Sequence, residues 1–166
     1  MKRIMMIAVA VFAAAILVKA VTKPEENAVV ECTPAERMYE AIILHADSFD
    51  VPLHIAFNVA TIETGYRGPS DSNYIPNKVS SAGAVGPMQI MPQYASWFAG
   101  FTVKRQELKD SIELNVWLSM KILNYQYNRF GSWEKALGAY NTGRPIVNTY
   151  ARNGVRRDFY IKRWID

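Results

Sequence analysis

The stretch "PLHIAFNVATIETGY", residues 52–66, decides the expected fold. Pro52 suits the start of a helix, and Gly65 suits the position just after its last residue. The apolar residues between them are distributed nearly all the way round the helix instead of along one face. A helix of this kind is buried on all sides, so other helices must enclose it. We therefore expect a central helix from Pro52 to about Thr64.

One carboxylate, Glu63, stands in the last turn of this helix among apolar neighbours. Burial and the negative end of the helix dipole both disfavour the anion, so both should raise the pKa of Glu63. A carboxyl group that stays protonated near neutral pH can act as a general acid. An ordinary carboxylate turned toward water is the alternative that this feature alone leaves open.

The flanking segments predict further helices. Thr33 and Glu36 form a capping box around Pro34, which places a helix over residues 34–48. No long stretch shows the alternation of apolar and polar residues that is typical of a strand. The other expected helices are a short aromatic one from Pro92, one from a cap at Asp110 and Glu113 to Gly131, one from Ser132 to Gly143, and one over about 155–165. The sequence thus predicts an all-α domain.

A long loop separates the central helix from the later ones. Residues 66–86 are rich in Gly, Pro, Ser and Asn, and they show no helical periodicity. A loop of roughly 20 residues within a compact domain is usually functional or mobile. We expect this segment to contribute to the functional site and to contain at most a small irregular β piece.

The first 20 residues have the features of a secretory signal. Lys2 and Arg3 precede an uncharged run of 15 residues, and Ala20 follows it. That run is shorter than the roughly 20 residues of a membrane-spanning helix. We expect residues 1–20 to be a cleaved signal or an uncleaved anchor, residues 21–33 a linker, and residues 34–166 a single folded domain. Both interpretations export the domain to the periplasm or cell envelope.

Charge and cysteine content exclude several classes. The net charge is +4, but 16 basic and 15 acidic residues remain once the first 20 residues are set aside, so nothing indicates a nucleic-acid partner. Cys32 is the single cysteine of the chain, so packing and not an intramolecular disulfide must stabilise the domain. One cysteine and two histidines show no metal-ligand spacing, and we expect no metal.

Three later segments carry polar residues in distinctive surroundings. "SAGAVGPMQIMP", residues 81–92, places Gln89 between two apolar residues, and "ALGAYNTG", residues 136–143, places Tyr140 and Asn141 at a helix end. "RRDFYIKRW", residues 156–164, supplies Tyr160. Taken singly, they have ordinary explanations: a turn with a satisfied amide, a helix C-cap and an aromatic core residue.

Taken together, in this order and at this separation, the segments resemble the catalytic domain of the soluble-lytic-transglycosylase-like family. Members of this family are relatives of goose-type lysozyme and cleave peptidoglycan, and the resemblance covers about residues 36–165. "IETGY" resembles the catalytic-glutamate segment, with Thr64 where serine is more common. "GAVGPMQIMP" resembles the Gly-Leu-Met-Gln segment, with Pro87 for leucine, and "ALGAYNTG" resembles the Ala-Tyr-Asn-Ala-Gly segment, with Thr142 for alanine.

The resemblance implies a lysozyme-like helical domain with a long active-site loop and a groove for alternating aminosugars. It makes Glu63 the general acid and then the base of a peptidoglycan lytic transglycosylase, which forms 1,6-anhydro-muramoyl ends without a metal or organic cofactor. It also implies that a set of further residues lines the groove: Ser81, Met88, Gln89, Tyr140, Asn141 and Tyr160.

Two alternatives remain at this point. Ordinary glycosidases use two carboxylates, and a true lysozyme would need a second one, such as Asp71 positioning a water. Asp71 lies in the long loop, while Asp110 and Glu113 are assigned to a helix cap. The other alternative is a non-catalytic cell-wall-binding component. The expected partners are peptidoglycan strands, with a secretion, conjugation or phage-entry machinery as a further candidate, and the membrane if the N-terminal segment stays attached.

Overall fold

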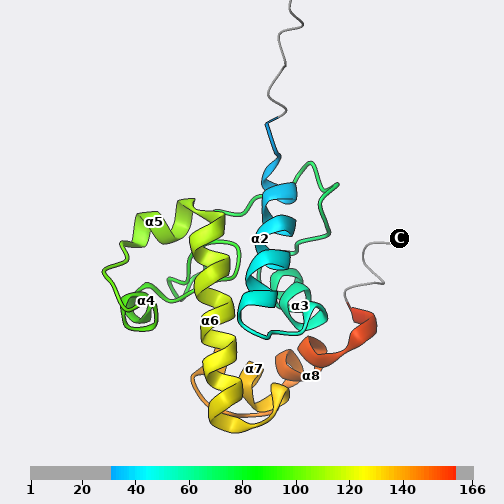
Figure 1. Cartoon of the computed structure of the whole chain (residues 1–166), viewed down its shortest axis with the longest axis vertical. Helices are drawn as coiled ribbons and strands as arrows, with labels where there is room; N and C mark the ends of the chain where they lie inside the picture. Colours follow the sequence, from blue (N-terminus) through cyan, green and yellow to red (C-terminus); the bar gives the residue numbers. More distant parts are fainter. Residues whose placement is uncertain (1–30, 160–166) are drawn as a thin grey trace, which may run out of the picture. The chain divides into compact units, whose positions relative to one another are not determined.

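The computed structural model describes residues 31–159, and the predicted all-α fold is confirmed. No helix in this described part of the chain is long and apolar enough to cross a membrane. Figure 1 shows the helices in sequence order, with α6 lying between α4 and α5 on one side and α2 and α3 on the other. Their bounds are α2 Pro34–Ser48, α3 Leu53–Thr64, α4 Pro92–Ala99, α5 Arg105–Asp110, α6 Ile112–Phe130, α7 Trp133–Thr142 and α8 Thr149–Val155.

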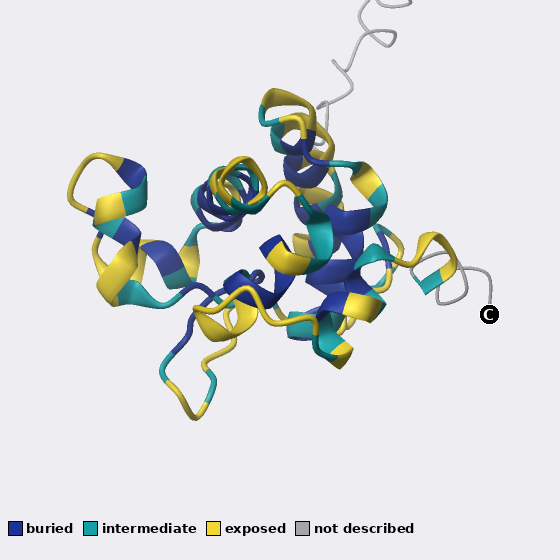
Figure 2. Ribbon diagram, turned by 90° about the horizontal axis from the view of Figure 1, so that it is seen from below, coloured by how far each residue is buried: buried dark blue, intermediate teal, exposed yellow. Residues whose placement is uncertain are grey.

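The helix α3 has the central position that its sequence predicts. It packs against α2 and α8, and most of its residues are buried, including Ile55, Phe57 and Val59. Figure 2 shows buried residues gathered where the helices meet and exposed residues on their outer faces. The helix begins one residue later than expected, and Gly65 ends it in the left-handed conformation that glycine adopts at little cost.

The predicted helix starts are mostly correct. Thr33 and Glu36 make the expected capping box of α2, and Ser132 caps α7. The predicted cap at Asp110 is wrong, because Ser111 caps α6 by accepting a hydrogen bond from the backbone N–H of Leu114. Asp110 is instead the last residue of α5.

Two short helices, α5 and α8, were not predicted. α5 is almost entirely polar and buries a single residue, Leu108, so it gives no apolar periodicity. α8 buries two small residues, Ala151 and Gly154, which likewise carry little hydrophobic signal. Of the helix predicted over 155–165, residues 157–159 are helical, and residues 160–166 lie outside the described part of the chain.

The long loop after α3 folds back on itself. Isolated antiparallel bridges join Val79 to Val85 and Val85 to Ile90, which is the small β piece that the sequence allowed. Gly86 lies between them with φ of +81°. A Cβ at this position would collide with the Asn115 side chain and would come within 2.8 Å of the Leu108 carbonyl oxygen. This close approach, together with the left-handed backbone, requires glycine.

A buried amide in the middle of α3 positions α8. Asn58 has no exposed surface, and its Nδ2 donates to the carbonyl oxygens of Gly154 at 2.9 Å and Arg156 at 2.8 Å. These carbonyls belong to the C-terminal end of α8, where a helix lacks internal donors. On its other side α8 approaches α7 closely, since a Cβ on Gly154 would lie 2.6 Å from Leu137 Cδ1. The placement of α8 therefore depends on Asn58 and Gly154.

Substitution of Asn58 by alanine tests this dependence. We expect Asn58→Ala to lower the free energy of unfolding by about 1–3 kcal/mol, because it leaves buried carbonyl groups without a donor. Chemical denaturation of the parent and the variant measures the change. A variant as stable as the parent would show that α8 holds its position without this amide.

Candidate active site

Glu63 lies in the last turn of α3 and is half-buried. Its carboxyl oxygen Oε1 accepts a hydrogen bond of 2.7 Å from the hydroxyl of Tyr150, a residue 87 positions later in the chain. Tyr150 is the second residue of α8. The contact therefore joins the end of the central helix to the start of a helix that the sequence did not reveal.

Burial sets the protonation state of both partners. It raises the pKa of Glu63 to about 7, and the hydrogen bond from Tyr150 acts in the opposite direction. Burial, reinforced by the charge of Glu63, holds the pKa of Tyr150 well above its usual value. Tyr150 thus stays a phenol and remains a donor at all physiological pH values, while Glu63 exchanges its proton near neutrality. This agrees in direction with the pKa shift that the sequence predicts.

Tyr140 ties α7 to the long loop behind the site. Its hydroxyl donates to the carbonyl oxygen of Met88 at 2.7 Å, and the hydroxyl of Ser119 lies 2.9 Å away. Because the single phenolic hydrogen goes to Met88, Ser119 must be the donor in the second bond. Burial is the main cause of the raised pKa of Tyr140, and the charge of nearby Glu63 adds to it. The predicted residues Glu63 and Tyr140 are thus brought together.

The other predicted residues occupy different positions. Met88 is completely buried, and its backbone carbonyl oxygen accepts the hydrogen bond from Tyr140. Asn141 is exposed and accepts a hydrogen bond from the side chain of Asn148. Ser81 is exposed at the tip of the loop. Tyr160 lies outside the described residues. The sugar-binding roles of these residues stay predictions.

Gln89 has an unusual backbone. Its φ is +52°, in the left-handed region that few residues other than glycine adopt. Its side-chain Nε2 donates to the carbonyl oxygens of Gly86 at 2.8 Å and Lys78 at 3.2 Å. Backbone conformations of this kind cost energy and are concentrated at functional sites. The loop thus holds Gln89 in a costly conformation beside Tyr140.

A second buried amide, that of Asn115, holds this loop in place through hydrogen bonds. Asn115 on α6 has no exposed surface, and its Oδ1 accepts the backbone N–H of Met88 at 2.9 Å. Its Nδ2 donates to the carbonyl oxygens of Val85 and Leu108. Asn115 was not among the predicted site residues. A polar residue within the apolar face of a long helix is the sequence signal that could have identified it.

Two of the three departures from the family pattern, Thr64 and Pro87, contact each other. The Thr64 hydroxyl donates its single hydrogen to the Pro87 carbonyl oxygen at 2.9 Å, and the Ala60 carbonyl oxygen lies 3.2 Å from the same Oγ1. The hydroxyl of Tyr74 lies 3.1 Å from Thr64 Oγ1, and Lys78 Nζ donates to the Thr64 carbonyl oxygen. The end of α3 is therefore bonded to the loop directly beside Glu63.

A cavity of about 520 Å³ has Tyr140 in its wall. The predicted residues Gln89, Tyr140 and Asn141 line it. Its further wall comes from α4 and α6, through Tyr94, Phe98, Ile122 and Gln126. The cavity is large enough for a ligand the size of a sugar unit or more.

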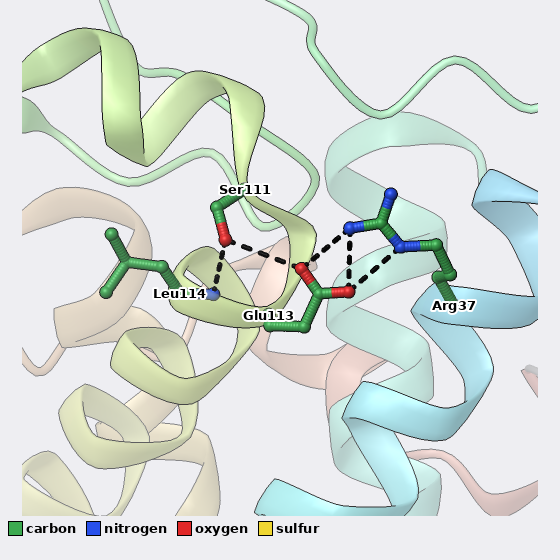
Figure 3. A network of polar contacts seen from close by, with 4 residues as sticks. All are labelled: Arg37, Ser111, Glu113 and Leu114. Atoms are coloured by element: carbon green, nitrogen blue, oxygen red, sulfur yellow. Dashed lines mark hydrogen bonds and ion pairs between the residues drawn. The ribbon is translucent and has the colours of Figure 1, made fainter.

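Three other carboxylates form hydrogen bonds or ion pairs with residues other than Glu63. Figure 3 shows Glu113 in a bidentate ion pair with Arg37, with N–O distances of 2.8–3.0 Å, while Ser111 contacts its other side. Asp110 accepts a hydrogen bond from Gln106, and Asp71 accepts one from the backbone N–H of Asn73. Within residues 31–159, no cluster of three His, Cys, Asp or Glu side chains could hold a metal ion.

Residues 46–161 match a protein-family model described as the transglycosylase SLT domain, and this match spans more than half of the chain. The chain belongs to the transglycosylase SLT domain family. Its members are lytic transglycosylases, so membership identifies peptidoglycan as the substrate class. A search among curated proteins gave no match.

Replacement of Glu63, the predicted catalytic glutamate, tests both its chemistry and its effect on stability. Glu63 titrates at about 7 in the folded chain and near its ordinary value of 4.5 in the unfolded one. The unfolded chain therefore releases this proton first, so the stability contributed by Glu63 falls between these pH values and stays reduced above them. We expect Glu63→Gln to remove this fall in stability with pH, so that the variant is at least as stable as the parent at pH 8. We also expect the variant to digest peptidoglycan at least about a hundredfold more slowly. Thermal unfolding across pH and digestion rates measure the two effects.

Glu113→Gln is the matched control, because it neutralises a different carboxylate by the same change. Its ion pair with Arg37 is about half exposed. We expect a loss of at most about 1 kcal/mol of stability and unchanged digestion. A Glu63→Gln variant that is clearly less stable than the parent at pH 8 would contradict the strained-carboxyl interpretation.

Tyr150→Phe should change the pH dependence of digestion. The variant removes the hydrogen bond that favours the Glu63 anion, so burial acts unopposed and the pKa of Glu63 rises further. We expect the decline of kcat/KM at high pH to move to higher pH. The measurement is a pH–rate profile, with Tyr127→Phe as the control. This control removes the hydroxyl group of an exposed tyrosine whose ring stacks on Trp133. Identical profiles for the parent and Tyr150→Phe would show that the titration of Glu63 does not set the pH dependence of digestion.

Proposed function

We propose that this chain is a peptidoglycan lytic transglycosylase that cleaves the bond between N-acetylmuramic acid and N-acetylglucosamine and leaves 1,6-anhydro-muramoyl ends. The observation that carries the proposal is one half-buried carboxyl group with a pKa of about 7, hydrogen-bonded by a phenol. Such a group is half protonated near neutral pH. It can donate a proton in one step and accept one in the next.

In the first step the protonated Glu63 gives its proton to the bridging oxygen. The bond from C1 of the muramoyl unit to that oxygen then breaks, and the N-acetylglucosamine unit leaves with a new hydroxyl group. Positive charge develops on the muramoyl C1, and negative charge remains on Glu63. The Tyr150 hydroxyl, 2.7 Å from Oε1, stabilises the carboxylate at this stage.

In the second step the Glu63 carboxylate takes the proton from the 6-hydroxyl of the same muramoyl unit, as that oxygen forms a bond to C1. Glu63 is protonated again, and no water is consumed. The nucleophile is already part of the substrate, so the enzyme does not have to position one. This intramolecular attack has the advantage of high effective concentration.

The surroundings of the other acidic groups support a reaction with a single carboxylate. Inverting and retaining glycosidases place a second carboxylate across the scissile bond. Here Glu113 is paired with Arg37, and Asp71 caps its own turn in the loop. A substrate that supplies its own nucleophile does not need the second group.

The roles of the other groove residues and the location of the chain belong to the same proposal. Gln89, Tyr140 and Asn141 line one cavity, where they would orient the sugars. Tyr140 also lies close enough to Glu63 for the charge of Glu63 to help raise its pKa. The basic, then apolar start of the sequence supports export to the cell envelope. Local opening of the wall for a secretion, conjugation or phage-entry machinery is a role that fits such an enzyme.

Product analysis tests the reaction. We expect digestion of purified peptidoglycan by the full chain to release muramoyl ends that are one water lighter than hydrolysis products, with no label when the reaction runs in heavy-oxygen water. Mass spectrometry of the soluble fragments measures both quantities, and Glu63→Gln provides the background. Labelled free reducing ends would identify a hydrolytic lysozyme, and equal release by parent and variant would identify a non-catalytic wall binder.

A further inference from the structure

Aromatic side chains from α4 and α6 are gathered at the cavity and next to it. Tyr94, Trp97 and Phe98 come from α4 and Tyr125 from α6, and we call these four residues the aromatic cluster. Tyr94 and Phe98 line the cavity that Gln89 and Tyr140 also line. Two members of the cluster therefore line the same cavity as Tyr140, whose pKa the charge of nearby Glu63 helps to raise.

The rings of the cluster are unusually open to solvent. Trp97 is 67% exposed and Tyr94 58%, whereas tryptophan is on average highly buried. Trp97, Phe98 and Tyr125 meet one another edge to face, with centroids 4.5–5.5 Å apart. Their mutual contacts hold the rings in fixed orientations. With two thirds of the residue exposed, Trp97 keeps surface available for a ligand beside its contacts with Phe98 and Tyr125.

The walls of the cavity are uncharged. None of the described residues that line it is acidic or basic, and its polar side chains include the amides of Gln89, Gln93, Gln126 and Asn141. In addition, Oε1 of Gln126 is buried and has no hydrogen-bond partner among the described residues. A buried acceptor without a donor is costly.

This chemistry fits a neutral aminosugar. One face of a pyranose ring presents C–H groups that pack on an aromatic ring, while its hydroxyl and acetamido groups pair with side-chain amides. A charged stem peptide or a charged segment of another protein would find no counter-ion in this cavity and would lose hydration without compensation. The walls therefore favour the neutral sugar backbone over the peptide stems.

We propose that the aromatic cluster forms a distal subsite, which holds a neutral N-acetylated sugar of the same strand beyond the two sugars that flank Glu63. The inference rests on the proposed function for its substrate, and it adds a length preference to it. Strands that reach both the catalytic carboxyl group and the cluster bind more tightly than strands that end before the cluster. The cluster contributes to binding and not to the chemical step.

Removal of the exposed rings tests the length preference. The full chain and its Trp97→Ala variant are compared on peptidoglycan strands of defined length. For long strands we expect KM to rise roughly tenfold with kcat unchanged, since one lost ring contact has about that effect on binding. For the shortest strand that the parent cleaves, we expect no change. Equal effects on both lengths, or no effect on either, would overturn the subsite.

The matched control uses two tyrosines of one helix. Tyr125 belongs to the cluster, whereas Tyr127 stacks on Trp133 and lines a different hollow. Tyr125→Ala should raise KM for long strands, and Tyr127→Ala should leave it unchanged. If Tyr127→Ala has the same effect, general loosening of α6 and not a subsite explains the loss.

A binding assay separates this inference from the proposed function. The probe is a neutral N-acetylglucosamine hexamer, and its binding to the full chain is followed by titration calorimetry and by tryptophan fluorescence. We expect Glu63→Gln to bind it as the parent does and Trp97→Ala to bind it roughly tenfold more weakly. An inactive parent that shows this difference would refute the transglycosylase reaction alone. Equal affinity of parent and Trp97→Ala would refute the subsite, and it would leave the exposed cluster as a surface for a protein partner.

Discussion

The hydrogen bond between Tyr150 and Glu63 is the contact on which the arrangement of the site depends. A carboxyl group at the end of a buried helix loses hydration, and it is tolerable only with a donor or in its protonated form. The structure provides both, because Tyr150 stays a phenol and burial moves the pKa of Glu63 to about 7. The donor can be in place only if α8 is, and Asn58, in the same helix as Glu63, bonds the end of α8. Thus α3 carries the acid and also the amide that positions its partner.

Hydrogen bonds from side chains of the helices hold the backbone of the long loop in one conformation. Asn115 bonds the backbone on both sides of Gly86, Tyr140 bonds the carbonyl of Met88, and Thr64 bonds that of Pro87. Each of these loop contacts uses a backbone group. This explains how the departures at residues 64 and 87 are accommodated: a threonine hydroxyl donates as a serine hydroxyl would, and the carbonyl of residue 87 accepts whatever its side chain is.

The site combines costs that a purely structural protein would avoid. Glu63 is disfavoured as an anion, Gln89 adopts a left-handed backbone, and Gln126 holds a buried oxygen without a partner among the described residues. Such costs are concentrated where a protein handles a ligand. Gln89 and Gln126 line the same cavity as Tyr140, and Glu63 lies close enough to Tyr140 for its charge to raise the pKa of that phenol.

The sequence by itself determined the all-α fold, the central helix, most helix ends, and Glu63 as an acid with a raised pKa. These features follow from local patterns: apolar residues round one helix, a capping box at Thr33, and Gly65 after the last turn. The tertiary structure alone decided the partner of Glu63, because Tyr150 is 87 residues away on a helix whose buried residues are too small to give a signal. It also decided that Asn115 fixes the loop and that Ser111, not Asp110, caps α6. Hydrogen bonds between distant segments are set by packing geometry, which no local periodicity records.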